Sequence, residues 1–375
     1  MEPIALYIHI PFCVKKCAYC DFNSYAAPEL MPSYLSALKK EMAGYKAAGY
    51  AVKTVYMGGG TPTILSKEDL ASLIQNIHSS FYIAPGAEFT VEANPGTLTK
   101  EKLLLLKHMG VNRLSIGLQA YQDRLLKVMG RIHTVKDFEE SFALARQAGF
   151  DNINVDVIFG LPGQTLFDFK ETLKNLVRLS PEHISCYALS VEEGTEFYNR
   201  LEQGRLFLPP EDEERAMYHE AVTFLKSRGF VHYEISNFAK PGRESRHNLA
   251  YWRCEEYLGV GAGAHSFLNG ERFYNRSSLK EYIDCLESGL SPVEGREVMD
   301  MEALQAEFCF LGLRLTEGIS KTDFKIRFGR DLKEVYGKAI QRLKDSGLLQ
   351  EDGERFRLTS KGLDLANEVF MEFLP

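Results

Sequence analysis

Short apolar runs alternate with amphipathic segments over the first 240 residues. The apolar runs are expected to be strands, at residues 6–10, 54–57, 88–92, 113–116, 152–159 and 183–189. The amphipathic segments between them are expected to be helices, at about residues 32–48, 67–80, 99–108, 121–148 and 166–178. Strands that alternate with helices indicate parallel βαβ units. Six such units predict an α/β fold, a partial (β/α)6 barrel that is open on one side, with its chemistry at the C-terminal ends of the strands.

The pattern changes after the barrel. A helix at 212–229 and a late strand at 231–238 are expected to end it, so the first domain is predicted to span residues 1–240 and a connecting segment residues 241–299. From residue 300 to 375 the sequence predicts a mostly helical, winged-helix-like domain, with helices at 301–313, 321–328 and 332–346 and a hairpin that turns at Asp352-Gly353. Such modules often bind DNA, but this one is not markedly basic, so a lid or a partner-docking role is favoured.

Composition narrows the classes of partner. The net charge of the 375-residue chain is −7 and there is no basic block, which argues against a nucleic-acid surface. Seven cysteines are an odd number, and three of them lie on one loop, which suits metal binding in a reducing compartment better than a disulfide framework. No apolar run reaches the length of a membrane span, and the sequence enters its first strand without a signal peptide. A cytoplasmic protein with no transmembrane segment is expected.

The three clustered cysteines directly follow the first predicted strand. Cys13, Cys17 and Cys20 have the spacing C-x3-C-x2-C, so three thiolates can converge on one soft metal centre. A 4Fe–4S cluster held by three cysteines leaves one iron open to a small molecule. The alternatives are a structural zinc site, which usually takes four protein ligands, and three unrelated cysteines. The spacing and the strand that precedes it favour the cluster.

Other polar motifs lie where later strands are expected to end. Gly58 to Thr63 form the run GGGTPT, whose glycines let the backbone approach a ligand closely. Glu92 ends the third strand, and its alternative role is that of a solvated acid at a strand end. Asp156 lies inside an apolar run, where burial without a partner is costly, so it is expected to pair with Arg131 or a ligand, or to face the barrel lumen.

The cysteine spacing resembles the signature of the radical S-adenosylmethionine (SAM) superfamily. Together with GGGTPT, SIGLQ, DVIFGLPGQT and YALSVEEGTEF, it makes the chain similar to the oxygen-independent coproporphyrinogen III oxidase family over essentially its whole length, and most of all to that family's heme-chaperone branch. The resemblance implies a radical-SAM barrel with a 4Fe–4S cluster, SAM and a C-terminal helical domain. Transferred by position, it implies contacts to a first SAM from Tyr7, Tyr19, Gly59, Gly60 and Glu92, and to a second from Thr61, Gln119, Arg131, Asp156 and Ala188.

The chain departs from the oxidase pattern in two ways. Phe22 stands where the oxidase has the last cysteine of a CxC pair, and the N-terminal extension that helps to close the oxidase's substrate site is expected to be absent. The stretch HNxxYW contains His247, Tyr251 and the only tryptophan, Trp252. Histidine is a common axial ligand of heme iron and aromatic side chains offer flat apolar contact to a porphyrin, although a lone histidine is more often structural.

The favoured function is therefore that of a heme-binding chaperone. The resemblance implies delivery of heme to recipient proteins, respiratory enzymes among them, and a reductant such as flavodoxin or ferredoxin for the cluster. The alternatives are a true oxidase, which would convert coproporphyrinogen III to protoporphyrinogen IX, and a scaffold whose barrel only binds a tetrapyrrole. Cys254, close to HNxxYW, is a competing soft ligand for the iron.

Overall fold

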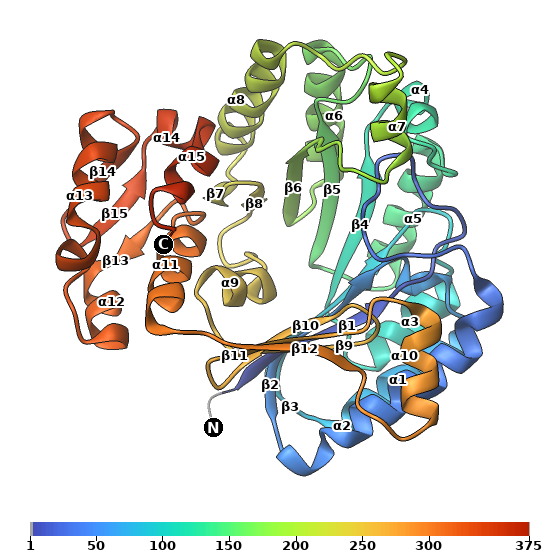
Figure 1. The fold of residues 1–375 in the computed structure, drawn as a ribbon. Helices are drawn as coiled ribbons and strands as arrows, with labels where there is room; N and C mark the ends of the chain where they lie inside the picture. Colours follow the sequence, from blue (N-terminus) through green and yellow to red (C-terminus); the bar gives the residue numbers. More distant parts are fainter. Residues whose placement is uncertain (1–2, 375) are drawn as a thin grey trace.

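The computed structural model describes residues 3–374, and its main feature is one twelve-stranded sheet (Figure 1). The strand order is β12-β11-β10-β9-β1-β2-β3-β4-β5-β6-β8-β7. Six central strands run parallel in chain order: β1 (Ile4–Ile10), β2 (Ala51–Gly59), β3 (Tyr82–Ala93), β4 (Arg113–Gln119), β5 (Ile153–Phe159) and β6 (His183–Ala188). Within the described residues, β12 and β7 end the sheet without pairing to each other. The barrel is therefore open, and the predicted α/β fold with a partial barrel is confirmed.

Helices cover the outer face of the parallel strands. They are α1 (Met31–Gly44), α2 (Lys67–Ser80), α3 (Lys100–His108), α5 (Val135–Gln147), α6 (Leu166–Leu179) and α8 (Glu211–Ser227), with short 3-10 turns η1 (Pro28–Leu30), η2 (Lys46–Ala48) and η3 (Pro62–Ile64). Helices α4 (Asp123–Val128) and α7 (Glu196–Glu202) pack instead against Ala18 of the cysteine loop. The side chains of Thr99, Thr134 and Thr165 cap α3, α5 and α6 by accepting a backbone N–H of the first turn. Short polar caps thus mark where these three strand-to-helix connections end.

Two expected elements are each divided in the structure. The single helix predicted at 121–148 is wrong, because α4 and α5 are separate helices. Gly130 takes a φ of 74° after α4, and Thr134 with Asp137 forms a capping box that starts α5. The single strand predicted at 231–238 is also wrong, because β7 (Val231–Glu234) and β8 (Asn237–Ala239) form an antiparallel pair. The carboxylate of Glu234 accepts hydrogen bonds from the backbone of Ser236 and the side chain of Asn237, which stabilises the turn.

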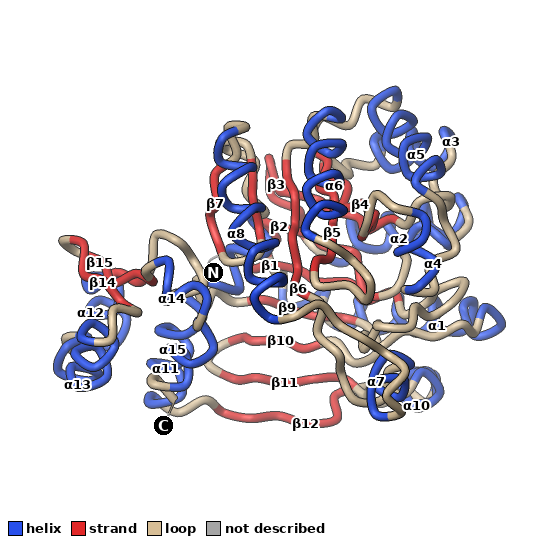
Figure 2. Tube along the Cα trace, turned by 90° about the horizontal axis from the view of Figure 1, so that it is seen from above, coloured by secondary structure: helices blue, strands red, loops and turns tan. Residues whose placement is uncertain are grey.

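The segment predicted as a connector contributes four strands to the main sheet. They are β9 (Tyr257–Val260), β10 (His265–Leu268), β11 (Glu271–Asn275) and β12 (Val293–Val298), and the segment also forms α9 (Arg246–Trp252) and α10 (Leu279–Glu287). Strand β9 pairs in parallel with β1, and β10 to β12 follow it in antiparallel order. Figure 2 shows these strands side by side beyond β1. Sequence analysis did not predict this extension of the barrel sheet.

The parallel strands separate an outer apolar face from a polar lumen by simple alternation. In β4, Leu114, Ile116 and Leu118 are fully buried in the core beneath the helices, whereas Ser115 and Gly117 line a cavity inside the barrel. This period of two is what an extended strand imposes on its side chains. It leaves polar groups on the lumen face at every second position, where a ligand can meet them.

A buried carboxylate joins the N-terminal half of the barrel to the strands beyond β1. Glu41 of α1 accepts hydrogen bonds from the backbone of Gly261 at 2.8 Å, from Asn275 Nδ2 at 2.6 Å and from the Tyr282 hydroxyl. Burial raises the pKa of Glu41 to about 7, although its three donors oppose that rise. Glu41 thereby ties α1 to the β9–β10 loop, to β11 and to α10.

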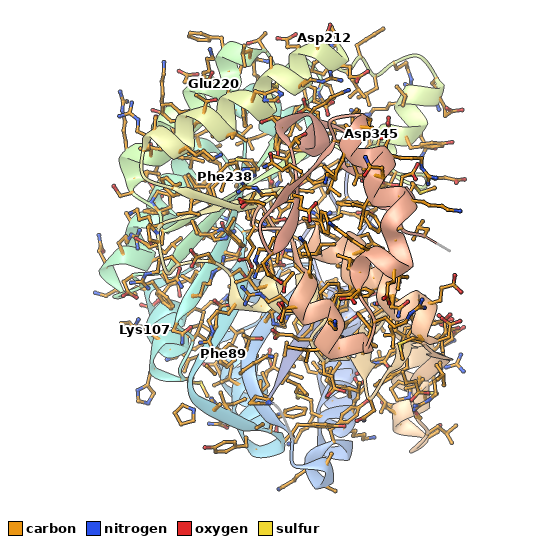
Figure 3. The ribbon with its side chains drawn as sticks, turned by 90° about the vertical axis from the view of Figure 1, so that its left-hand side faces the viewer. Phe89, Lys107, Asp212, Glu220, Phe238 and Asp345 are labelled. Atoms are coloured by element: carbon orange, nitrogen blue, oxygen red, sulfur yellow. The ribbon has the colours of Figure 1, made fainter. Side chains whose placement is uncertain are left out.

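The C-terminal domain has its own core and attaches to the barrel at β7. It comprises α11 (Met301–Gly312), β13 (Ile319–Ser320), α12 (Lys321–Phe328), α13 (Leu332–Asp345), β14 (Leu349–Asp352), β15 (Arg355–Leu358), α14 (Ser360–Asp364) and α15 (Ala366–Met371). Phe324 and Phe356 are fully buried in its core, and the strands pair in the order β13-β15-β14. A bridge between Glu234 and Leu315 links it to β7. In Figure 3 this domain, with Asp345 labelled on α13, lies in front of the barrel strands that carry Phe238.

Across residues 3–374, none of the helices combines the length and apolar character needed to cross a bilayer.

Candidate functional site

The cysteine loop lies over a cavity of about 340 Å³ at the C-terminal ends of the parallel strands. Cys13, Cys17 and Cys20 all line this cavity and are half-buried. The loop is held from both sides, because Ala18 donates its N–H to the carbonyl of Met129 at 2.9 Å and accepts one from Phe197 at 2.8 Å. Its position at the barrel mouth is that expected for chemistry in a parallel α/β barrel.

The surroundings of the three thiols fit a cluster better than a single ion. The three cysteines are unbridged, and within residues 3–374 no three His, Cys, Asp or Glu side chains converge closely enough to hold one metal ion. A structural zinc site usually takes four protein ligands, whereas a 4Fe–4S cube distributes its cysteine ligands over separate irons. Cys17 Sγ lies 3.8 Å from Arg131 Nη1, a cation beside the thiols. Phe22, which stands where the oxidase has its last cysteine, is 64% exposed and supplies no fourth thiol.

The glycine loop after β2 packs directly against the backbone of the cysteine loop. Gly59 has a φ of 108°, and a Cβ atom there would lie 2.3 Å from the ring of His9. A Cβ atom on Gly60 would lie 2.6 Å from the carbonyl oxygen of Phe12. A side chain at Gly60 would push this loop away from the cysteine loop, and one at Gly59 would strike the His9 ring of β1, so glycine is required at both positions of the cavity wall.

Glu92 points into the cavity from the end of β3. Its carboxylate accepts hydrogen bonds from the Tyr56 hydroxyl at 2.7 Å and from the Gly59 N–H at 3.1 Å. Burial raises the pKa of Glu92 to about 7, and nearby Asp156 adds to the rise while the two donors oppose it. A carboxylate in this position retains free lone pairs that can accept hydroxyl donors from a ligand.

Asp156 and Arg131 lie in the same cavity but do not form an ion pair with each other. Asp156 accepts hydrogen bonds from Ser115 Oγ at 2.9 Å and Asn154 Nδ2 at 2.7 Å, and faces the lumen. Arg131 donates to Asn94 Oδ1 at 3.1 Å and to the carbonyl of Gly117 at 3.3 Å, and its Nε is buried without a partner. An unpaired buried donor beside the thiols is consistent with a site built for an acceptor from a ligand.

Most of the predicted SAM residues come together, and a few lie just outside the cavity. The cavity is lined by Tyr19, Gly59, Gly60, Glu92, Gln119, Arg131, Asp156 and Ala188. Thr61 is set back from it, with its hydroxyl 3.5 Å from Cys13 Sγ and 2.6 Å from Asn94 Nδ2. Tyr7 lies deeper, where its hydroxyl meets His9 Nδ1 at 2.9 Å.

The HNxxYW stretch is not part of this cavity. It forms α9, whose first two backbone N–H groups, on Arg246 and His247, donate to the Glu88 carboxylate at 3.1 Å each. Glu88 pairs with Thr54 in the middle of β3, four residues before Glu92, which lies next to the end of that strand. Helix α9 therefore meets the barrel on the side away from the cysteine loop, next to the C-terminal domain (Figure 1).

His247 is enclosed and uses both of its ring nitrogens. Nδ1 lies 2.9 Å from Thr54 Oγ1, Nε2 lies 2.9 Å from the Tyr251 hydroxyl, and the residue is 1% exposed. Burial lowers the pKa of His247 to about 3, and nearby Arg113 lowers it further, so the ring is neutral. In this arrangement neither nitrogen is free to bind an iron atom, because each already has a hydrogen-bond partner.

Tyr251 and Trp252 face the C-terminal domain rather than the lumen. Tyr251 lines a second cavity, of about 200 Å³, together with Cys254, Tyr257 and residues of α11. The guanidinium of Arg314 lies 4.3 Å from the centroid of the Trp252 ring, and Trp252 Nε1 is buried without a partner. The aromatic part of HNxxYW thus belongs to the interface between the two domains.

Sequence analysis missed several residues of the first cavity, among them Tyr56 and Asn94. Tyr56 lies two positions after Thr54 on the same face of β2, and Asn94 follows Glu92 at the same spacing and binds both Arg131 and Thr61. The period of two along each strand could have identified them, because Gly58 and Glu92 already marked the lumen face.

Comparison with known proteins places the chain in a defined group. Residues 7–176 match the Radical SAM superfamily and residues 300–365 match the HemN C-terminal domain. The chain is 44% identical to the heme chaperone HemW of Bacillus subtilis, with 98% of each chain covered, and 38% identical to that of Lactococcus lactis, with 100% of this chain and 98% of the relative covered. Coproporphyrinogen III oxidase (HemN) of Escherichia coli superposes with a TM-score of 0.87 at 24% identity, covering 99% of this chain and 90% of that one. At that identity the structural likeness concerns the fold alone.

Proposed function

The chain belongs to the heme chaperone HemW family, and from that membership we propose that it binds heme and delivers it to heme-requiring proteins. The observation that carries the proposal is the similarity to curated chaperones along both domains. Respiratory enzymes are the proposed recipients, the cytoplasm is the proposed compartment, and a flavodoxin or ferredoxin is the proposed reductant of the cluster.

Membership of the radical SAM superfamily brings a 4Fe–4S cluster and SAM as cofactors. When bound, they supply a single electron and a source of the 5′-deoxyadenosyl radical. Cys13, Cys17 and Cys20 are the proposed cluster ligands, since they share one cavity beside Arg131. Glu92 is proposed to accept the ribose hydroxyls of SAM, one of which takes the place of the Tyr56 hydroxyl on the carboxylate while the Gly59 N–H keeps its hydrogen bond.

The remaining SAM residues are proposed from their places around the same cavity. Gly59 and Gly60 let the backbone approach the ligand, and Arg131 offers its unpaired Nε as a donor. Five further residues complete the proposed contacts: Tyr7, Tyr19, Gln119, Asp156 and Ala188, with Thr61 orienting Cys13.

Heme is the cargo, and α9 is its proposed site. Tyr251 and Trp252 present aromatic surface at the domain interface, and His247 is the proposed axial ligand. Because Tyr251 occupies Nε2 of His247, its hydroxyl has to leave that nitrogen before the iron can bind there. Loading of heme on His247 therefore requires a local movement of Tyr251.

Oxidative decarboxylation of coproporphyrinogen III has less support. The full-length curated relatives reported above are chaperones, and the similarity to the oxidase structure concerns the fold. One anaerobic experiment separates the two functions. The reconstituted protein is titrated with hemin and, separately, incubated with coproporphyrinogen III, SAM and a reductant.

A Soret shift that saturates near one hemin per chain, without formation of protoporphyrinogen IX, is the expected result. His247→Ala should weaken or alter the Soret shift. The matched control is His219→Ala, because His219 is an exposed histidine that pairs with Asp364 away from α9. Conversion of coproporphyrinogen III, or a wild type that takes up no hemin, would contradict the proposal.

A further inference from the structure

The two proposed ligand sites are joined by a continuous series of contacts through Tyr56. Tyr56 lines the first cavity, and its ring extends from Glu92 at the strand ends to His247 of α9. Neither the family resemblance nor any motif gave Tyr56 a role. Its contacts on both sides suggest that it does more than fill the lumen.

The first contact fixes Tyr56 to the proposed SAM carboxylate. Its hydroxyl donates to Glu92 Oε1 at 2.7 Å. The packing is tight, because a Cβ atom on Gly58 would lie 2.8 Å from both Glu92 Oε2 and Tyr56 Cε1. Movement of the Glu92 carboxylate therefore changes the position of the Tyr56 hydroxyl, or removes its acceptor.

The second contact carries the ring of Tyr56 onto the heme motif. Tyr56 stacks on His247 with ring centroids 5.1 Å apart and an interplanar angle of 28°. Its other neighbour is Tyr7, at 6.3 Å and 29°. A ring held in a stack of three cannot turn at one end without loosening its contact at the other, because the interior is close-packed.

The third contact leads from His247 to the surface that would receive the cargo. The Tyr251 hydroxyl lies 2.9 Å from His247 Nε2, and the Tyr251 ring packs edge-on to Tyr257 at 4.7 Å in the wall of the second cavity. Release of the Tyr251 hydroxyl is the step that exposes Nε2. Tyr56 therefore stacks on the same histidine ring whose Nε2 the Tyr251 hydroxyl occupies.

We propose that Tyr56 is a positioning residue that couples occupancy of the Glu92 site by SAM to occupancy of α9 by heme. In the observed arrangement, Glu92 holds Tyr56 against His247, and His247 holds Tyr251. When Glu92 accepts ribose hydroxyls instead, Tyr56 loses its acceptor and the stack on His247 loosens. The inference rests on the proposed function. It predicts positive cooperativity, in which SAM and heme each favour the binding of the other.

The coupling is measured by hemin titration of anaerobic protein with an oxidised cluster and no reductant, so that SAM is not consumed. Saturating SAM should tighten hemin binding at least about fivefold, the lower end of typical coupling between sites. Hemin should tighten SAM binding by the same factor, because linkage is reciprocal. This second titration needs no variant and therefore does not depend on whether a mutant folds.

Tyr56→Phe keeps the ring and removes the donor to Glu92. The variant should bind hemin with one affinity whether or not SAM is present. Tyr121→Phe is the matched control, since Tyr121 also donates its hydroxyl to a glutamate, Glu139, but on an exposed surface. It should retain the full coupling.

The outcomes separate this inference from the function on which it rests. Hemin binding that SAM leaves unchanged in the wild type, or coupling that persists in Tyr56→Phe, would overturn the inference and leave the chaperone function standing. A wild type that binds no hemin under either condition would overturn both.

Discussion

Replacing Glu92 by glutamine tests the proposed SAM site most directly, because it removes one charge and little volume. The amide oxygen of the Glu92→Gln variant would still accept the Tyr56 hydroxyl, but the amide nitrogen would face the Gly59 N–H, where two donors meet. A hydrogen bond to a charged acceptor contributes about 1.5–3 kcal/mol. The variant should therefore bind SAM roughly ten- to a hundredfold more weakly, since 1.4 kcal/mol is about tenfold in affinity.

The same carboxylate predicts how SAM affinity varies with pH. The pKa of Glu92 is raised by burial to about 7, so below that pH the free protein carries a neutral acid that must lose its proton before hydroxyl donors are well accepted. Affinity should be constant above about pH 7 and fall by up to about tenfold for each pH unit below it. In Glu92→Gln this slope should disappear.

Anaerobic calorimetry at about pH 6, 7 and 8, on either side of the raised pKa and on protein with equal cluster content, measures both effects. Glu139→Gln, on the exposed outer surface, is the control and should behave as the wild type. Equal SAM affinity in Glu92→Gln and wild type would refute the assignment of Glu92 to the site. A wild-type affinity that is flat across this pH range would refute the pH argument, even if the variant binds more weakly.

Two further predictions concern the cluster and the fold. Replacing Cys13, Cys17 or Cys20 by alanine should abolish the iron–sulfur absorbance after anaerobic reconstitution, whereas the control Cys285→Ala should keep it. If any of the first three variants still reconstitutes with as much iron as the wild type, the cluster lies elsewhere. Glu41→Gln leaves one buried donor without its acceptor and should lower the free energy of unfolding by about 1–3 kcal/mol. Because burial raises the pKa of Glu41 from 4.5 to about 7, its native state holds the proton more tightly than the unfolded chain, so wild-type stability should fall as pH rises from about 4.5 to 7. Urea unfolding between about pH 4.5 and 7 should show that the free energy of unfolding falls less steeply with pH in Glu41→Gln than in the wild type. The same slope in both proteins would contradict the assignment of this pH dependence to Glu41.

The order of strands and helices in the barrel followed from local periodicity. Alternating apolar positions and short polar caps are properties of neighbouring residues, so all six parallel strands were predicted in the right order, although β2 and β3 begin three and six residues earlier than expected. The cysteine loop was predictable for the same reason, because its three thiols lie within eight residues of sequence. Parallel strands bring their C-terminal ends to one edge, and Glu92, Gln119 and Asp156 accordingly line one cavity with the cysteines.

Pairing between distant segments was decided only by the tertiary structure. Strand β9 lies parallel to β1, more than two hundred residues earlier, and nothing in its four residues specifies that neighbour. The HNxxYW stretch has a recognisable composition and brings Tyr251 to Nε2 of His247 locally, but only its place against Thr54, 193 residues away, determines that Nδ1 is occupied as well. Tyr56 meets Glu92 across 36 residues and meets His247 on its other side. Sequence patterns report which face of an element is apolar, whereas the partner of each polar atom depends on how those faces are brought together in space.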